Sequence, residues 1–362
     1  MISMDGPLKQ CTIDYAILQT PFHRTTFFLG IRPLPDSYAG DTHVSETTLN
    51  LLIQQIRLEG EGTTSFDLVF ADERKLPPFA AGAHVNVQIP GGLRRSYSLV
   101  NTPSDRTRYR IAVKREPDSL GGSAWLHEKA RVGMALQVSL PLNDMTLVEE
   151  APLSVFIAGG IGITPMLSMI ERLVELGRPW QLHYSARTPR QMAFRQALKE
   201  LEANGLGQVH LHFTGDGEGR LDINQIAHNA PPDAHLYACG PASLIDGFIT
   251  ATQARHPKTA HYERFSAAQE AATTGGFELQ LLRDGRTLQV PEGKSILDVL
   301  LDANVNVEYA CTQGVCGTCR VGVKGGVPDH RDDCLSDEEK AANDTIITCC
   351  SGSRSATLVL DL

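Results

Sequence analysis

Four cysteines near the end of the chain have the spacing of an iron–sulfur site. Three stand in C-x4-C-x2-C order and the fourth follows far downstream: Cys311, Cys316, Cys319 and Cys349. Plant-type [2Fe–2S] clusters take their thiolate ligands in this pattern. Two glycines inside the loop allow the backbone to curl and to aim N–H groups at the cluster sulfurs. Zinc sites usually show two close pairs of cysteines, so the spacing favours a one-electron carrier.

The fourth ligand is ambiguous, because Cys349 is followed directly by Cys350. Neighbours on an extended strand face opposite sides, so only one of the two can point into a cluster. Cys11 and Cys334 belong to no motif, and we interpret both as structural or incidental.

The run Arg95-Ser96-Tyr97-Ser98 lies on a predicted strand, with Arg95 and Tyr97 on one face and Ser96 and Ser98 on the other. A flavin needs a cation for its phosphate, an aromatic side chain beside its ring and a hydrogen-bonding group near N5. The run supplies all three. An ordinary amphipathic strand with an exposed arginine would show the same alternation.

A second phosphate-binding element follows at Gly121, Gly122 and Ser123, before a predicted helix over 124–130. We expect Ser123 to be the N-cap, and a helix N-terminus behind two glycines accepts a phosphate. A capped turn without a ligand is the alternative. The two elements together favour a flavin site.

A glycine-rich turn follows the buried strand predicted at 155–159. It reads Gly-Gly-Ile-Gly-Ile-Thr-Pro from Gly159 and contains Gly160, Gly162 and Thr164. We expect Thr164 to cap a helix that starts at Pro165, with its positive end against a pyrophosphate. The turn is not the dinucleotide fingerprint, because a proline stands where the third glycine would be. The strand–turn–helix context predicts nucleotide binding.

Cys239, Gly240 and Pro241 end another predicted strand of the same sheet. Ligands of open α/β sheets bind at this edge, so the Cys239 thiol could lie against a nicotinamide ring. A buried strand cysteine before a turn is the plain alternative.

The elements around these motifs fall into successive segments. Six short alternating strands with one helix predict an antiparallel β-barrel flavin domain over 47–150. Alternating strands and helices predict a parallel α/β nucleotide-binding domain over 151–266. A small polar linker over 267–276 leads to a hairpin, a helix and the cysteine loop of 277–362. Residues 1–46 are an extension of unknown role.

The composition is that of a globular protein, with 42% hydrophobic and 21% charged residues among 362. No apolar run reaches the length of a membrane span or a signal peptide, so we expect a cytoplasmic monomer. A net charge of −9 argues against nucleic acid as a partner. Residues 277–362 hold 14 acidic against 8 basic side chains, which would steer that domain towards a basic partner.

The order of flavin barrel, nucleotide sheet and cluster domain resembles the phthalate dioxygenase reductase family, which includes vanillate demethylase reductases. The resemblance covers 48–362 and implies a multidomain chain ending in an α+β plant-type ferredoxin (β-grasp) domain. It implies FMN at Arg95–Ser98, Lys114 and Gly121–Ser123. It also implies NADH at Gly159–Thr164 and at Cys239–Pro241.

The resemblance also implies roles for Glu263, Phe265 and Cys349. Glu263 and Phe265 belong to a segment that closes the sheet near the flavin, and the Cys-x-Ser pattern favours Cys349 as the fourth ligand. Arg187 follows the second strand of the sheet, where an acidic residue for the adenosine ribose is absent. NADPH is therefore kept as an alternative to NADH. FAD is kept as an alternative to FMN.

The predicted function is an electron relay from NADH through a flavin to the cluster. Ser98, Thr164 and Cys239 are the residues expected beside the reacting groups. The resemblance implies a Rieske-type terminal oxygenase as the acceptor. A di-iron or P450 monooxygenase as acceptor, or a redox sensor gated by the cluster, are the alternatives.

Overall fold

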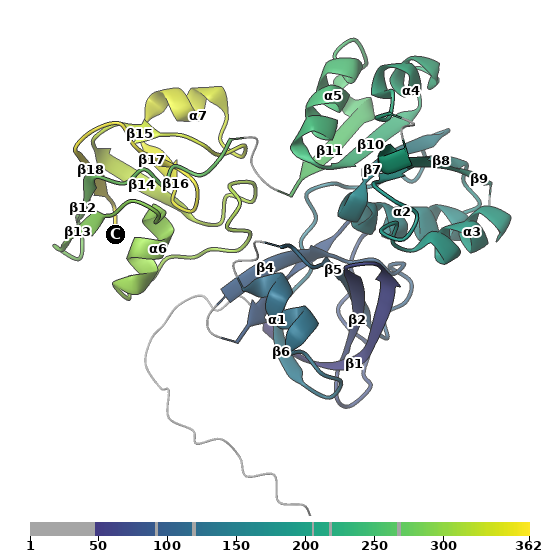
Figure 1. Cartoon of the computed structure of the whole chain (residues 1–362), viewed down its shortest axis with the longest axis horizontal. Coiled ribbons are helices and arrows are strands. Elements are labelled where there is room, and N and C mark those ends of the chain that lie inside the picture. Colours follow the sequence, from purple (N-terminus) through teal and green to yellow (C-terminus); the bar gives the residue numbers. More distant parts are fainter. Residues whose placement is uncertain (1–47, 91–92, 118–120, 205, 217–218, 266–268) are drawn as a thin grey trace, which may run out of the picture. The chain divides into compact units, whose positions relative to one another are not determined.

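The computed structural model describes residues 48–90, 93–117, 121–204, 206–216, 219–265 and 269–362 (Figure 1). The extension predicted at 1–46 lies outside these residues, as does Cys11. The described residues belong to one compact unit and form an antiparallel, a parallel and a mixed sheet in succession. This is the order that the changes of sequence pattern predict.

The first sheet has six antiparallel strands in the order β4-β3-β6-β1-β2-β5. Its strands are β1 (Thr48–Gly60), β2 (Thr63–Val69), β3 (His84–Ile89), β4 (Leu93–Ser98), β5 (Tyr109–Lys114) and β6 (Ala135–Ser139). A bridge joins Leu99, directly after β4, to Ile111 of β5, so the two edges of the sheet meet. Leu51 and Ile53 face the interior and are fully buried, as the alternating pattern requires. The predicted barrel is confirmed.

Helix α1 (Gly122–Glu128) begins two residues earlier than expected. Its N-cap is Gly121, with a φ of 104° that favours glycine, and no side chain caps it. The prediction that Ser123 is the N-cap is therefore wrong. The Ser123 Oγ instead accepts a hydrogen bond from the backbone N–H of Glu116 at 3.2 Å.

The second sheet is fully parallel, in the order β11-β10-β7-β8-β9. Its strands are β7 (Ser154–Gly159), β8 (Trp180–Ala186), β9 (Gly207–Phe213), β10 (His235–Gly240) and β11 (Ala260–Arg264). Its helices are α2 (Ile163–Glu175), α3 (Arg195–Asn204), α4 (Ile223–Asn229) and α5 (Ala242–Thr252). The chain leaves β7 towards β8 and later returns to pair β10 with β7 from the other side. The strand order therefore reverses at the carboxyl ends of β7 and β10, where such sheets bind ligands.

Two hydrophobic cores cover the faces of this sheet. Helices α2 and α3 pack against one face around Tyr184 and Leu182, and α4 and α5 pack against the other around Ile157 and Leu236 (Figure 1). Helix α2 starts at Ile163 rather than at Pro165, because the 3₁₀ turn η1 (Gly160–Gly162) leads directly into it. None of the helices in the described residues is long and apolar enough to cross a membrane.

The third sheet is mixed, in the order β13-β12-β18-β14-β16. Its strands are β12 (Phe277–Leu281), β13 (Thr287–Val290), β14 (Arg320–Gly325), β16 (Thr345–Ile347) and β18 (Thr357–Leu360), and β15 (Pro328–Asp329) pairs separately with β17 (Gly352–Ser353). Helix α6 (Ile296–Asp302) packs into its core, and α7 (Asp337–Ala342) precedes β16. Ser295 makes a capping box with Asp298, which fixes the start of α6. The cysteine loop lies between α6 and β14 in the chain and leads directly into β14.

Candidate functional site

The cysteine loop brings the predicted cluster ligands together. The Cys311 thiol is within hydrogen-bonding contact of Cys316 and Cys349, and Cys349 is also in contact with Cys319. The Cys311 Sγ accepts the backbone N–H of Gln313 at 3.3 Å. The loop therefore offers four converging sulfurs and an inward N–H group, which is the donor set that a [2Fe–2S] cluster takes.

The structure distinguishes the two adjacent cysteines. Cys349 and Cys350 lie in a turn after β16, not on the extended strand that the sequence suggested. The Cys349 thiol contacts Cys311 and Cys319 as well as Cys350, whereas the Cys350 Sγ lies 4.0 Å from the Ile347 carbonyl oxygen and 3.8 Å from the Ser351 Oγ. This geometry supports Cys349 as the fourth ligand. The Cys334 Sγ lies 3.7 Å from the Asp332 Oδ2. Its interpretation as structural or incidental stays a prediction.

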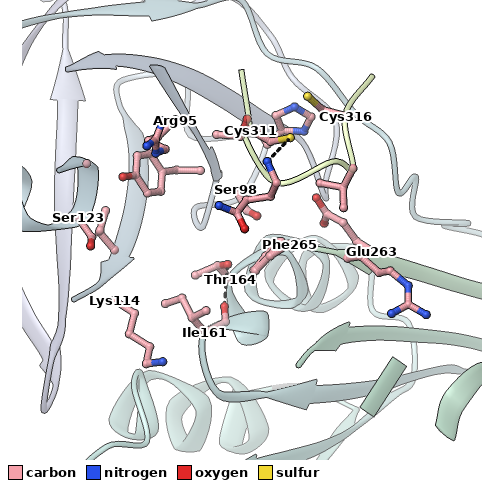
Figure 2. Close-up of a pocket in the computed structure, with 18 of the residues that line it drawn as sticks. Arg95, Ser98, Lys114, Ser123, Ile161, Thr164, Glu263, Phe265, Cys311 and Cys316 are labelled. Carbon is pink, nitrogen blue, oxygen red and sulfur yellow. Dashed lines mark hydrogen bonds between the residues drawn. The ribbon is translucent and has the colours of Figure 1, made fainter. Parts of the chain in front are cut away.

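A cavity of about 920 Å³ collects side chains from the first two sheets and from the loops of the cluster region (Figure 2). Among the predicted site residues, those in its wall are Arg95, Ser96, Tyr97, Ser98, Lys114, Gly122, Ser123, Thr164, Glu263, Phe265, Cys311 and Cys316. The structure thus joins the predicted flavin strand, the nucleotide turn and the cluster loop around one space.

The flavin candidates occupy the barrel side of this cavity. Arg95 donates from Nη1 to the Arg94 carbonyl oxygen at 2.8 Å, which fixes its side chain along β4. A Cβ at Gly122 would stand 2.8 Å from the Arg95 Cγ, so glycine is needed where α1 meets this arginine. Burial raises the pKa of Tyr97 to about 12, so its hydroxyl stays neutral. A cation, a neutral aromatic and the start of a helix fit a flavin phosphate and ring.

Both serines of the flavin strand line the cavity, although strict alternation put them on the face opposite Arg95. The Ser96 hydroxyl is engaged within the sheet, where it donates to the Asn86 Oδ1 at 2.6 Å. Ser98 is buried at the end of β4, and Figure 2 shows it at the centre of the pocket near Thr164 and Phe265. Ser98 is therefore the better of the two for a contact to a flavin nitrogen.

The glycines of the nucleotide turn serve close packing as well as phosphate approach. A Cβ at Gly162 would stand 2.1 Å from the Cys239 carbonyl oxygen, and one at Gly159 would stand 2.7 Å from the Pro241 Cδ. The two predicted nucleotide motifs therefore pack against each other at the carboxyl ends of β7 and β10. Gly160 has a φ of 56° and open space beside it, which leaves room for a ligand to approach the backbone.

The prediction that Thr164 caps helix α2 is wrong, because Thr164 is the second residue of the helix. Its Oγ1 donates to the Ile161 carbonyl oxygen at 2.9 Å, and both residues face the cavity (Figure 2). The N-cap position is taken by Gly162, because η1 continues into α2 without a break. The hydroxyl still lies at the positive end of the helix, where a pyrophosphate is favoured.

Cys239, Gly240 and Pro241 are not part of the cavity wall. Cys239 is fully buried, and this burial raises its pKa well above the usual thiol range, with a smaller contribution from Glu263 once that carboxyl ionises. Its neighbour Glu263 does face the cavity, and one of its oxygens is buried without a hydrogen-bond partner among the described residues. Burial raises the pKa of Glu263 to about 8, so a neutral carboxyl is available to a carboxamide.

Sequence reasoning missed several residues of the wall. His84 opens β3 and faces Asp144, with its Nδ1 3.8 Å from a carboxylate oxygen, and Gln313 and Val315 extend from the cluster loop. His84 belongs to no motif, whereas Gln313 and Val315 stand inside the cysteine loop, and only the folded chain brings all three to this point. His84 lies on a strand that pairs with the flavin strand, which is the one indication the sequence held.

Comparisons with known proteins identify the two carboxyl-terminal segments directly. Residues 156–249 match the oxidoreductase NAD-binding domain, and residues 279–353 match the 2Fe-2S iron-sulfur cluster binding domain. The phenoxybenzoate dioxygenase subunit beta of Ectopseudomonas oleovorans is 48% identical over 87% of this chain and 97% of its own length. The structure of phthalate dioxygenase reductase matches with a TM-score of 0.74 and 38% identity, covering 87% of this chain and 98% of the other. The chain belongs to the phthalate dioxygenase reductase family.

A vanillate O-demethylase oxidoreductase of Pseudomonas sp. (strain HR199 / DSM 7063) is 40% identical over 87% of this chain and its whole length. The predicted reductase function, with NAD(P)H oxidation and a [2Fe–2S] cluster, is therefore confirmed for this member of the phthalate dioxygenase reductase family. The three-part fold is confirmed in the same way. The residues that hold each group stay predictions.

Proposed function

We propose that this chain is the NADH-dependent, FMN-containing reductase of a Rieske-type terminal oxygenase in the cytoplasm. The observation that carries the proposal is the shared cavity: Cys311 of the cluster loop, Ser98 of the flavin strand and Glu263 line one space. The nucleotide, the flavin and the cluster would then meet at one cavity, so electrons would pass between them without a separate carrier protein. The printed names of the relatives, a phenoxybenzoate dioxygenase subunit and a vanillate O-demethylase oxidoreductase, support an oxygenase as the acceptor.

FMN, when bound, supplies the change from two-electron to one-electron chemistry. The barrel residues would hold it: Arg95 and the start of α1 pair with its phosphate, Tyr97 lies beside its ring and Ser98 donates near N5. Lys114 forms an ion pair with Glu116 at 3.1 Å and adds a second cation at the cavity rim.

The nucleotide residues bind and orient. The backbone of η1 and the Thr164 hydroxyl would hold the pyrophosphate, and Glu263 would hold the nicotinamide carboxamide. Phe265, which is half-buried and follows β11 directly, would cover the nicotinamide ring and exclude water. The cluster residues would hold the two irons as thiolates: Cys311, Cys316, Cys319 and Cys349.

The flavin is tested by chromatography of the cofactor released on denaturation, and recovery of FAD would contradict the proposal. The acceptor is tested by mixing the NADH-reduced protein with a purified Rieske oxygenase, a di-iron hydroxylase or a P450 in separate stopped-flow runs. We expect rapid reduction of the Rieske protein alone. Rapid reduction of either other acceptor, with none of the Rieske protein, would favour the corresponding alternative.

A further inference from the structure

Three histidines form a cluster on the parallel sheet, away from the cavity described above. They are His183 on β8 and His210 and His212 on β9, and the ring centroids of His183 lie 4.6 Å from His210 and 6.1 Å from His212. His183 and His210 are register partners on these adjacent strands. His210 and His212 are two residues apart on one strand, so all three share one face.

This face lies opposite α2 and α3, and the core under α4 and α5 on the same face takes no described residue from β8 or β9. On β8 the buried side chains of Leu182 and Tyr184 join the core under α2 and α3, whereas His183 between them points the other way. On β9 the pattern repeats, since Val209 and Leu211 pack on that core. His210 is exposed and the other two histidines are half-buried, so the cluster is open to solvent ions.

The His183 ring is held in the neutral form, which binds metals. Burial, and to a smaller extent the neighbouring His210 and His212, lower the pKa of His183 to about 4. A neutral imidazole keeps a lone pair for coordination at neutral pH.

We propose that His183, His210 and His212 bind one divalent first-row transition metal ion, with Zn²⁺ and Cu²⁺ as the fitting ions. Three imidazoles, two of them at positions i and i+2 of a strand and the third on the neighbouring strand, can supply three corners of a tetrahedron, and water supplies the fourth. The site is separate from the cysteine loop and does not depend on the electron relay.

Binding requires side-chain rotation. The rings of His183 and His210 are stacked at an angle of 19°, and the three histidines are not already arranged around a common point. Rotation of an exposed imidazole between staggered rotamers is a small adjustment. The backbone positions, which are set by strand pairing, need not move.

The ion would join the edge strand to the sheet. Strand β9 has one neighbour, β8, and the chain between them contains α3. A metal that ties His183 to His210 and His212 closes this segment into a loop and limits the fraying of the edge. The expected effect is stabilisation of the nucleotide-binding domain, without a change in the chemistry of the relay.

The experiment uses tag-free protein with its flavin and cluster in place. Zn²⁺ is titrated by calorimetry, and Cu²⁺ is titrated with the cluster oxidised and read by electron paramagnetic resonance. We expect one ion per chain, nitrogen splitting from imidazole ligands, and a higher melting temperature with Zn²⁺. The His210→Gln and His183→Gln variants should each weaken binding at least about tenfold.

The matched control is His228→Gln, an exposed histidine of α4 outside the cluster. It should bind Zn²⁺ as the unmodified protein does. His210 is exposed, so its variant tests the site even if His183→Gln impairs folding. The proposal is overturned if the unmodified protein shows no saturable binding at about 100 μM Zn²⁺. Equal binding by His210→Gln and the unmodified protein would overturn it as well.

Discussion

Cys239 and Glu263 are register partners on the adjacent parallel strands β10 and β11. The thiol is fully buried, and a Glu263 oxygen is buried without a partner among the described residues. Burial is the main cause that raises the pKa of the thiol, and the Glu263 carboxylate raises it further once it ionises. Two acidic groups thus share the carboxyl edge of the sheet, and both are held neutral.

The first prediction concerns the pH dependence of stability. The pKa of Glu263 is about 8 in the folded chain, against an ordinary value of 4.5. The stabilisation from this group is therefore complete below pH 4.5 and is lost as the pH rises through 8. A shift of this size corresponds to about 3–5 kcal/mol. Urea unfolding of the nucleotide-free protein should show this loss, and Glu263→Gln should remove it.

A matched variant separates this effect from other titrations. Glu150→Gln changes an exposed carboxylate and should leave the pH profile of unfolding unchanged. If the Glu263→Gln and unmodified proteins lose the same free energy of unfolding between pH 5 and pH 9, the carboxyl of Glu263 is charged in the folded state.

The second prediction concerns the fourth cluster ligand. Cys349→Ser should abolish the visible absorbance of the [2Fe–2S] cluster while the flavin is retained. Cys350→Ser, one residue away, should keep the cluster, because its thiol is turned towards the Ile347 carbonyl oxygen. Iron and sulfide analysis of both proteins gives the answer. A cluster that survives Cys349→Ser and is lost in Cys350→Ser would reverse the assignment.

The sequence predicted the elements well where a pattern was local. Alternation and turn residues predict strands over 84–89, 109–114 and 287–290, and β3, β5 and β13 have these ranges. The helix starts near Ser123 and Thr164 were misplaced. In each case a glycine with helical or left-handed backbone took the cap position, so the polar residue behind it was free to face the cavity.

The cavity itself was beyond sequence reasoning. Motifs predicted its contributors one by one, but His84 and Asp144 carry no motif and reach it only through the pairing of distant strands. The reverse holds for Cys239, whose motif was visible but whose thiol the fold buries outside the wall. Spacing predicts which residue types are present, whereas exposure is decided by packing.

The third prediction tests the close contact between α1 and the flavin strand. Gly122→Ala places a methyl group 2.8 Å from the Arg95 Cγ, and this atom is too near the backbone to move freely. The guanidinium is displaced, and FMN affinity should fall about tenfold or more, since a charge-assisted hydrogen bond contributes about 1.5–3 kcal/mol. Fluorescence titration of the flavin-free protein measures it.

Gly247→Ala is the control for that change. It introduces the same methyl group into α5, at 3.3 Å from the Ile223 Cδ1, and lies outside the wall of the cavity. FMN affinity should stay within about twofold of the unmodified protein. Equal losses of FMN affinity in the two variants would show that an added methyl group in a helix lowers the affinity without the contact to Arg95.

The fourth prediction concerns the choice of nucleotide. Arg187 follows β8, is exposed, and is fixed through its carbonyl oxygen, which accepts the Gly215 N–H at 2.8 Å. Its side chain stands where an acid would repel a 2′-phosphate. Arg187→Ala should lower kcat/KM for NADPH about tenfold and leave NADH within about twofold, because an arginine–phosphate contact is worth about 1.5–3 kcal/mol.

Steady-state reduction of cytochrome c with each nucleotide measures the two values of kcat/KM. Arg190→Ala, at a nearby exposed arginine, serves as the comparison and should change neither value by more than about twofold. An unchanged NADPH to NADH ratio in Arg187→Ala would show that the 2′-phosphate does not meet this side chain. The choice of nucleotide would then have to be made by another residue at the carboxyl edge of β8.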